Sequence, residues 1–196
     1  VIGCKDSLPV DLNANLYFYE TYLDSLKSSL GIADETDWAQ KAERRKKMID
    51  SLMWNTKTEM YYDYNFVTKK QSEVISCAAF HPYFVKMADE NKACGLANAY
   101  NALMKKYGLA CTDRDYGHYQ WSYPNGWAPL QYIAYIALKN YNMADKAKNV
   151  AEKYVELLEK VYEETGTTFE KYNVADGNDH TLDESKVHHT MMGWTA

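Results

Sequence analysis

The sequence lacks several features that would mark particular classes of protein. No apolar run is long enough to span a bilayer, so we predict no membrane segment. Lys and Arg number 22 against 27 Asp and Glu, and the formal charge of -5 argues against a nucleic-acid partner. No glycine-rich phosphate loop, nucleotide fingerprint or Ser-His-Asp order is evident. What is present is a globular composition, with 46% hydrophobic residues over 196 positions.

Cysteine is scarce, and its spacing favours neither a metal site nor a disulfide framework. The four cysteines are Cys4, Cys77, Cys94 and Cys111. They show no CxxC spacing, and two of them, Cys77 and Cys94, fall within predicted helices. We therefore expect buried free thiols, with disulfides left open as the alternative.

Two kinds of helical pattern alternate along the chain. The first kind is apolar or aromatic on most sides and covers 12–30, 76–87 and 129–141. The second kind has one apolar stripe opposite a charged surface and covers 38–54, 91–107 and 143–162. For the second helix, Asp34 is the expected N-cap. The apolar stripe of 91–107 consists of Leu96, Ala99, Tyr100 and Leu103.

The alternation of enclosed and half-exposed helices is repeated three times. A toroid of two concentric helix rings requires this pattern, because its inner helices contact both the pore and the outer ring. From the residues alone the chain is an all-α array of helical hairpins. One short β-hairpin is expected as well, with a strand in 60–66 and its partner or turn in 66–71.

The stretch from Gln120 to Pro129 combines two indoles, two prolines, a glycine and two amides in ten residues. Indole faces cover the apolar faces of sugar rings, and amides pair with ring hydroxyls. We therefore predict a sugar-binding loop in which Trp121 and Trp127 shape the pocket while Gln120 and Asn125 hold hydroxyls.

This decapeptide resembles the second motif of the trehalase family of glycoside hydrolases, Gln-Trp-Asp-x-Pro-x-Gly-Trp-x-Pro, with Ser122 in place of the aspartate. Three further segments resemble family landmarks and follow in the family's order. They are Pro9-Val10-Asp11-Leu12-Asn13, Trp54-Asn55 with the hairpin that follows it, and Phe169-Glu170-Lys171-Tyr172-Asn173-Val174.

The resemblance implies an (α/α)6 toroid, of which residues 1–196 would form roughly the C-terminal half. Both ends of the sequence are expected to be truncations, so the absence of a targeting segment carries no information on location. Three hairpins alone would leave aromatic inner helices facing water. We therefore expect the missing N-terminal half of the barrel to accompany this chain. The family favours a periplasmic or other extracytoplasmic location, which the residues themselves do not indicate.

The resemblance also implies an inverting hydrolase that splits α,α-trehalose into two glucoses. Such an enzyme needs one protonated carboxyl group and one ionised carboxylate. The family's base corresponds to Glu170, with Lys171 and Tyr172 placed to orient it. The family's acid lies upstream of the segment that resembles Pro9 to Asn13, so this chain alone is expected to be catalytically silent.

Two departures from the family pattern leave other functions open. Ser122 cannot hold a negative charge near a developing oxocarbenium ion, and the region 175–189 does not match the family's glycine-rich loop. The alternatives are a relative that binds a disaccharide without cleaving it, and an α-glycosidase of the same fold with another substrate. Asp183 or Glu184 is a loose match to a further family acid.

We predict no cofactor and no metal. Possible ligands do occur together at Asp176, Asn178, Asp179 and His188-His189. However, the run lacks the alternating acids of a calcium loop, and adjacent histidines on a helix point apart. A polar loop is the preferred interpretation. His118 is expected to satisfy a loop carbonyl, with contact to substrate as the alternative.

Overall fold

The computed structural model describes residues 4–117, 119–183, 190 and 193–195. Helices dominate it, as the all-α prediction requires. The α-helices are α1 (Val10–Leu30), α2 (Trp38–Leu52), α3 (His81–Phe84), α4 (Ala93–Leu103), α5 (Ala128–Asn140) and α6 (Ala144–Thr165). Short 3-10 turns are η1 (Cys4–Asp6), η2 (Cys77–Phe80) and η3 (Glu90–Lys92). No described helix is both long enough and apolar enough to cross a membrane.

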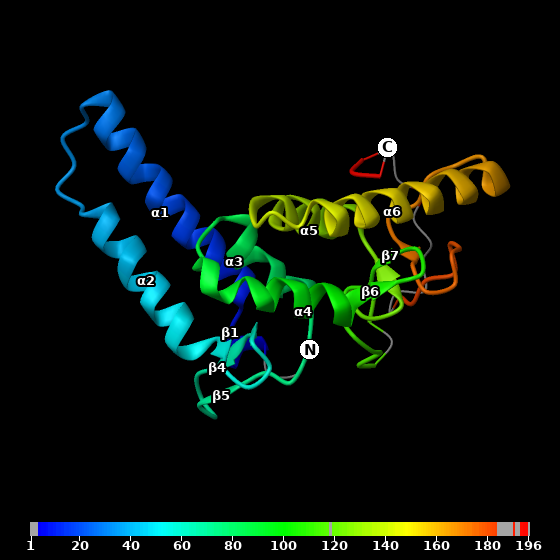
Figure 1. The fold of residues 1–196 in the computed structure, drawn as a ribbon, viewed down its shortest axis with the longest axis horizontal. Coiled ribbons are helices and arrows are strands. Elements are labelled where there is room, and N and C mark those ends of the chain that lie inside the picture. The colour runs from blue at the N-terminus through cyan, green and yellow to red at the C-terminus, as the bar shows by residue number, and fades with distance from the viewer. Residues whose placement is uncertain (1–3, 118, 184–189, 191–192, 196) are drawn as a thin grey trace.

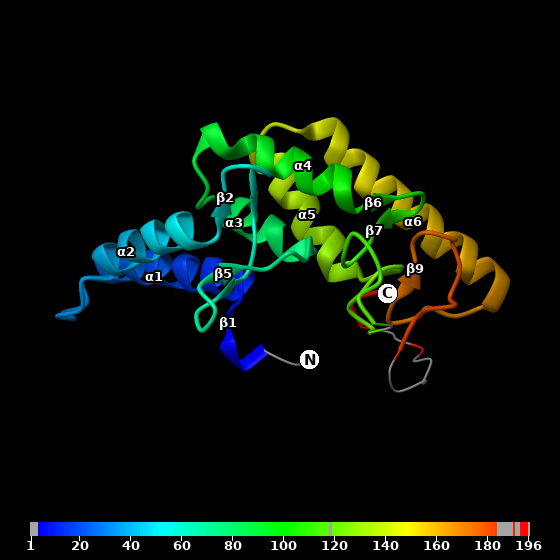
Figure 2. The same ribbon diagram turned by 90° about the horizontal axis from the view of Figure 1, so that it is seen from below.

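The helices form three successive hairpins, which follow one another from left to right in Figure 2. α1 packs against α2, and α5 packs against α6. α3 contacts both α1 and α5, whereas α4 lies against η2. The first helices of the hairpins, labelled α1, α3 and α5 in Figure 1, therefore contact one another in one layer, and the second helices lie on one side of it, above it in Figure 2. This arrangement confirms the predicted alternation of inner and outer helices.

α1 has an apolar face that no other element of the described structure covers. It starts two residues before the predicted boundary, where the Val10 amide donates to the Asp63 carboxylate at 2.8 Å. It ends at Gly31, whose positive φ of 63° suits a helix terminus. Between these ends its exposed apolar side chains are Leu12, Phe18, Tyr19, Tyr22, Leu23 and Leu30. An apolar face of this kind is typical of a surface that another element covers.

The N-cap of α2 was predicted at the wrong residue. Asp37, not Asp34, caps this helix, and its carboxylate accepts from the Gln40 amide at 2.8 Å. Asp34 instead accepts from the Thr36 amide and from the Trp38 indole. These bonds lower the pKa of the Asp34 carboxyl, with the Thr36 amide as the largest cause. α2 begins at Trp38, where the sequence predicted it, so Asp34 lies too far upstream to cap it and closes the preceding loop instead.

Two of the predicted helices are shorter than expected. The predicted helix 76–87 is η2 followed by the single turn of α3, because Pro82 suits only the start of a helix and Lys86 has a positive φ of 56°. The predicted helix 91–107 ends at Leu103, because the residues after it form a β-hairpin. Within α4, Leu96, Ala99 and Leu103 are buried as predicted.

The strands are two residues long and all pair antiparallel. They are β1 (Ser7–Leu8), β2 (Trp54–Asn55), β3 (Met60–Tyr61), β4 (Tyr64–Asn65), β5 (Lys70–Gln71), β6 (Met104–Lys105), β7 (Gly108–Leu109), β8 (Asn125–Gly126) and β9 (Tyr172–Asn173). β4 pairs with β5, as the hairpin prediction for 60–71 implies, and also with β1. β3, however, does not join this hairpin and pairs with the preceding strand, β2.

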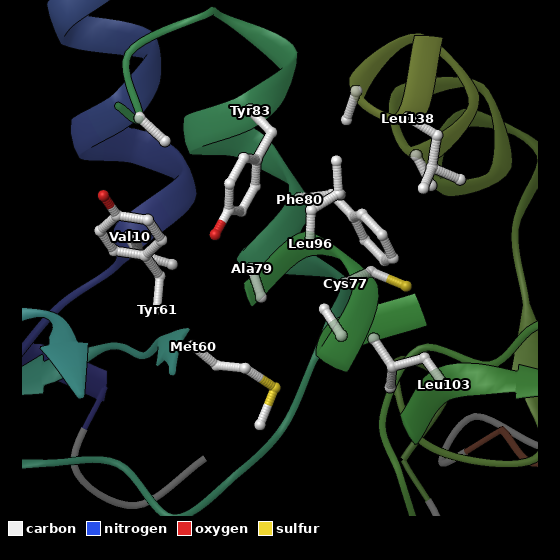
Figure 3. Close-up of a cluster of buried hydrophobic side chains, with 14 of the residues drawn as sticks. Val10, Met60, Tyr61, Cys77, Ala79, Phe80, Tyr83, Leu96, Leu103 and Leu138 are labelled. Carbon is white, nitrogen blue, oxygen red and sulfur yellow. The ribbon is translucent and has the colours of Figure 1, made fainter. Parts of the chain in front are cut away.

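One apolar core joins the three hairpins (Figure 3). It takes Val10 from α1, Phe80 from η2, Tyr83 from α3, Leu96 from α4 and Leu138 from α5. A second, smaller cluster lies beneath the loops after α4 and α6. Its members are Ala110, Tyr154, Leu157, Val161, Phe169, Tyr172 and Val174. This second cluster supports the segments that carry the predicted site residues.

The cysteines follow the expectation in part. Cys77 and Cys111 are buried free thiols, and Cys94 is an exposed one. Burial raises the pKa of the Cys77 thiol to about 12 and raises that of Cys111 well above its usual value. Both buried thiols are therefore protonated and act as small apolar side chains.

Gln131, the first of three polar residues in the otherwise apolar α5, anchors the site loops to the helix. Its side-chain oxygen accepts from the Leu109 amide at 2.8 Å, and its nitrogen donates to the Leu109 carbonyl at 2.8 Å. Both residues are buried. One amide thus satisfies both backbone groups of a residue in β7.

We predict that Gln131→Leu destabilises the protein by about 2–4 kcal/mol, because it leaves two buried backbone groups without these bonds. Chemical denaturation measures the effect. Lys139→Leu, an exposed change on the same helix, is the control and should stay within about 0.5 kcal/mol. An equally small loss for Gln131→Leu would contradict the anchoring role.

Candidate active site

A two-stranded ladder joins the two segments on which the functional prediction depends. β8 lies in the tryptophan-rich loop and β9 follows Glu170, with Asn125 opposite Asn173 and Gly126 opposite Tyr172. The Val174 amide extends the contact by donating to the Pro124 carbonyl at 3.0 Å. In Figure 2 the loop after β7 and the loop around β9 lie next to each other below α6. Residues that are 45 or more positions apart in the sequence thus share one surface.

Gly126 makes this close approach possible. A Cβ atom at this position would lie 2.4 Å from the Val174 Cγ1 atom and 2.8 Å from the Leu109 carbonyl oxygen. Only glycine lets three backbone segments meet here. The glycine of the motif therefore has a packing role.

Three indoles gather beside this ladder. Trp121 stacks on Trp127 with ring centroids 3.8 Å apart and an interplanar angle of 5°, and Trp194 meets Trp127 edge to face at 5.8 Å. Trp127 is only 1% exposed, whereas Trp121 and Trp194 are 49% and 47% exposed. The buried indole donates to the Gln120 carbonyl at 3.0 Å. Trp127 is thus the support, and the other two indoles offer apolar faces to a ligand.

Glu170 reaches this indole cluster through its neighbour Lys171. The Lys171 ammonium lies 5.2 Å from the centroid of the Trp127 ring, 3.6 Å from the Glu170 carboxylate and 2.6 Å from the Asp183 carboxylate. The side chains of Lys171 and Asp183 are 3% and 5% exposed, whereas that of Glu170 is 20% exposed. Of the two carboxylates, Glu170 is therefore the one that solvent or substrate can reach.

The backbone of Glu170 is tied to the same cluster. Its carbonyl accepts from the Trp194 indole at 3.2 Å. Two residues on, the Tyr172 hydroxyl accepts from the Phe169 amide at 2.8 Å, and burial raises the pKa of that hydroxyl. The carboxylate thus projects from a backbone that is fixed on both sides.

The amide of Asn125 is already bonded within the protein. Its nitrogen donates to the Gln120 carbonyl at 3.0 Å and to the Leu182 carbonyl at 2.6 Å, and its oxygen accepts from the Leu182 amide at 3.0 Å. The residue is fully buried. In this structure Asn125 holds two loops together, and its predicted contact with a sugar hydroxyl stays a prediction.

Ser122 is buried within its own loop. Its hydroxyl lies 3.2 Å from the Thr112 hydroxyl, accepts from the Tyr116 amide at 3.1 Å and donates to the Arg114 carbonyl at 3.4 Å. Thr112 in turn accepts from the Tyr123 amide at 2.9 Å. These bonds give position 122 a loop-closing role, whereas the sequence suggested a direct effect on the sugar.

The sequence analysis did not identify every residue of this cluster. Trp194 was not predicted as a site residue. Asp183 was only a loose match, and its partner Lys171 was not expected to be buried. His118, Glu184 and His188-His189 lie outside the described residues. Among the residues that are described, no group of three or more His, Cys, Asp or Glu is arranged to hold a metal ion.

A hollow elsewhere on the molecule is less suited to this chemistry. A cavity of about 350 Å³ lies between α1 and α2, lined by Glu20, Arg45 and Met48 among others. Glu20 and Arg45 bind each other there at 2.7 Å. We place the candidate site at the indole cluster, because the partly exposed carboxylate of Glu170 is linked to it through Lys171.

Comparison with protein families identifies what the chain is similar to. The trehalase family model matches residues 1–196. The periplasmic trehalase of Xanthomonas oryzae pv. oryzae is 32% identical over 195 residues, and that of Salmonella newport is 33% identical over 196. Both matches cover 96% of this chain but 33% of the relative. The chain thus spans about a third of the length of these relatives.

Solved structures resemble the chain in the same way. Neutral trehalase Nth1 from Saccharomyces cerevisiae is 25% identical with a TM-score of 0.81, covering 88% of this chain and 35% of the yeast protein. A GH63 mannosylglycerate hydrolase from Thermus thermophilus has a TM-score of 0.74 at 19% identity, covering 90% of this chain and 42% of that protein. The second match shows the fold alone.

The three hairpins therefore form part of an (α/α)6 toroid. Two of the segments that resemble family motifs, 120–129 and 169–174, meet at one ladder, and the family model covers the sequence from end to end. These findings show that the chain belongs to the trehalase family of glycoside hydrolases.

Proposed function

We propose that this chain is part of a longer inverting hydrolase that splits α,α-trehalose, with Glu170 as the general base. We call this longer polypeptide the full-length protein. It would supply the N-terminal half of the barrel. One observation carries the proposal: Glu170 is a partly exposed carboxylate next to Lys171, whose ammonium lies over the Trp127 ring, and the Glu170 carbonyl binds the Trp194 indole. Similarity to periplasmic trehalases supports an extracytoplasmic location.

In this proposal Glu170 takes a proton from water as the water attacks the anomeric carbon. The leaving glucose receives a proton from a carboxylic acid on the other side of the bond. Such pairs stand roughly 6.5–9.5 Å apart, which leaves room for the water. Asp183 is buried against Lys171, so we assign the proton donor to the part of the protein outside this chain.

The exposed indole supplies the sugar contact. We propose that Trp121 covers the apolar face of a glucose ring with the side that does not touch Trp127, and that Gln120 holds a hydroxyl. Trp127 and Asn125 shape the pocket from below, because both are buried and bonded to loop carbonyls. Their contribution to sugar binding is therefore indirect.

A hydrolysis screen of the full-length protein tests this function. We expect release of glucose from trehalose in preference to other α-linked disaccharides. The purified 196-residue chain is the control, and we expect it to release none because it lacks the acid. Hydrolysis of another disaccharide with trehalose left intact would replace the substrate assignment, and turnover by the isolated chain would contradict the role of a missing acid.

Ser122 favours one alternative function. It stands where the family motif has a carboxylate, which is the substitution expected of a relative that binds a disaccharide without cleaving it. The buried bonds of its hydroxyl weigh against this alternative, because they close a loop. Calorimetric binding of trehalose by the full-length protein with no glucose release would support the alternative.

A further inference from the structure

Lys171 holds the only ammonium group that the described structure places next to Glu170. Its side chain is almost fully buried, and its nitrogen faces two carboxylates and the ring of Trp127. A buried charge is costly unless it is paired. This lysine therefore needs its partners, and they are the groups of the proposed site.

The two carboxylates hold the ammonium unequally. Asp183 lies 2.6 Å from the Lys171 nitrogen, which is the distance of a strong charge-assisted hydrogen bond, whereas Glu170 lies 3.6 Å away. Asp183 thus binds the lysine directly. Glu170 feels the positive charge but keeps its oxygens available for other bonds.

The position of Asp183 is itself fixed from the tryptophan loop. Its neighbour Leu182 exchanges two backbone hydrogen bonds with the amide of Asn125, which belongs to β8. Lys171, in turn, immediately precedes β9, the partner of β8. Both ends of the ion pair are therefore attached to the same two-stranded ladder, beside the stacked indoles.

We propose that Lys171 is a positioning residue, which holds the Glu170 carboxylate next to the indole cluster while Asp183 keeps the ammonium from binding that carboxylate directly. This inference rests on the proposed function, because it assigns Glu170 the role of base. Without Asp183, the lysine is free to close the 3.6 Å gap to Glu170 and occupy the oxygen that must accept a proton from water.

Lys171→Met in the full-length protein tests the proposal. We expect kcat for trehalose to fall about 10- to 100-fold with KM changed less than about threefold, because a misplaced group costs rate more than binding. Lys171→Arg should recover most of kcat, because it restores the charge. Asp183→Asn should also lower kcat, through direct pairing of Lys171 with Glu170.

Folding must be separated from positioning, because Lys171→Met leaves Asp183 buried without its main partner. The double variant Lys171→Met/Asp183→Asn removes both charges together, and circular dichroism checks that it folds. We expect its kcat to stay low. Lys160→Met is the matched control, since Lys160 likewise lies over an aromatic ring, that of Tyr107, and donates to the Gly177 carbonyl at 2.6 Å. This variant should keep kcat.

The outcomes distinguish this inference from the proposed function. Wild-type kcat in a folded double variant, or an equal loss in Lys160→Met, would overturn the role of Lys171. If Glu170→Gln also keeps wild-type kcat, the assignment of the base fails as well. If Glu170→Gln is inactive while Lys171→Met turns over normally, only the positioning role fails.

Discussion

Replacing Glu170 by glutamine in the full-length protein will lower kcat for trehalose by about 10²- to 10⁴-fold, the range of general acid–base catalysis. Glutamine has nearly the same shape but accepts no proton from water. KM should change little, because the side chain meets water rather than the sugar in the proposed mechanism. Initial rates of glucose release over a range of trehalose concentrations separate the two constants.

Two further variants test whether the loss of kcat in Glu170→Gln is specific to the role of Glu170 as a base. Glu164→Gln changes an exposed glutamate near the end of α6 and should leave kcat unchanged. Glu170→Ala with added azide should regain turnover and give a glucosyl azide of inverted configuration, because azide attacks without needing a base. Retention of most of the wild-type kcat by Glu170→Gln would remove the carboxylate from the mechanism.

The second large expected effect is on stability and sugar binding when either of the two stacked indoles is removed. Trp127 is the buried support, and Trp121 is the exposed contact surface. Trp127→Ala removes one of the largest fully buried side chains and should destabilise the full-length protein by about 3–5 kcal/mol. Trp121→Ala removes a half-exposed ring and should cost less than about 1 kcal/mol. For Trp121→Ala we expect instead a rise in KM of about 2- to 10-fold, from lost stacking on the sugar.

Urea denaturation and trehalose kinetics on both variants check this division. Trp127→Phe is the control for Trp127→Ala, because it keeps an apolar ring in the same place and should recover much of the stability. Equal stability losses for the two alanine variants would contradict the assigned roles. So would an unchanged KM in Trp121→Ala.

Much of the fold follows from local patterns. The long helices are recognisable because their apolar stripes extend over three or more turns, as in α2 and α6. The segment 76–87 fails this test, because a single short apolar run does not distinguish a helix from two short turns. Pro82 was the available signal, since proline is tolerated only in the first turn of a helix.

The candidate site is predictable only in part. Glu170 and the tryptophan loop stand out through their resemblance to family motifs, but their adjacency depends on the pairing of β8 with β9. No local pattern indicates that pairing, because strands of two residues carry no periodicity. The ion pair of Lys171 with Asp183 spans 12 positions and depends on the same ladder. Long-range backbone pairing is therefore the information that the sequence alone does not provide.

The anomeric form of the first glucose released by the full-length protein tests the central claim most directly. Proton NMR at early times, before mutarotation equalises the anomers, should show equal amounts of α- and β-glucose from α,α-trehalose. Water that is activated by Glu170 inverts one anomeric carbon, and the leaving glucose keeps its α configuration. Exclusive release of α-glucose, or no release of glucose at all, would contradict the account.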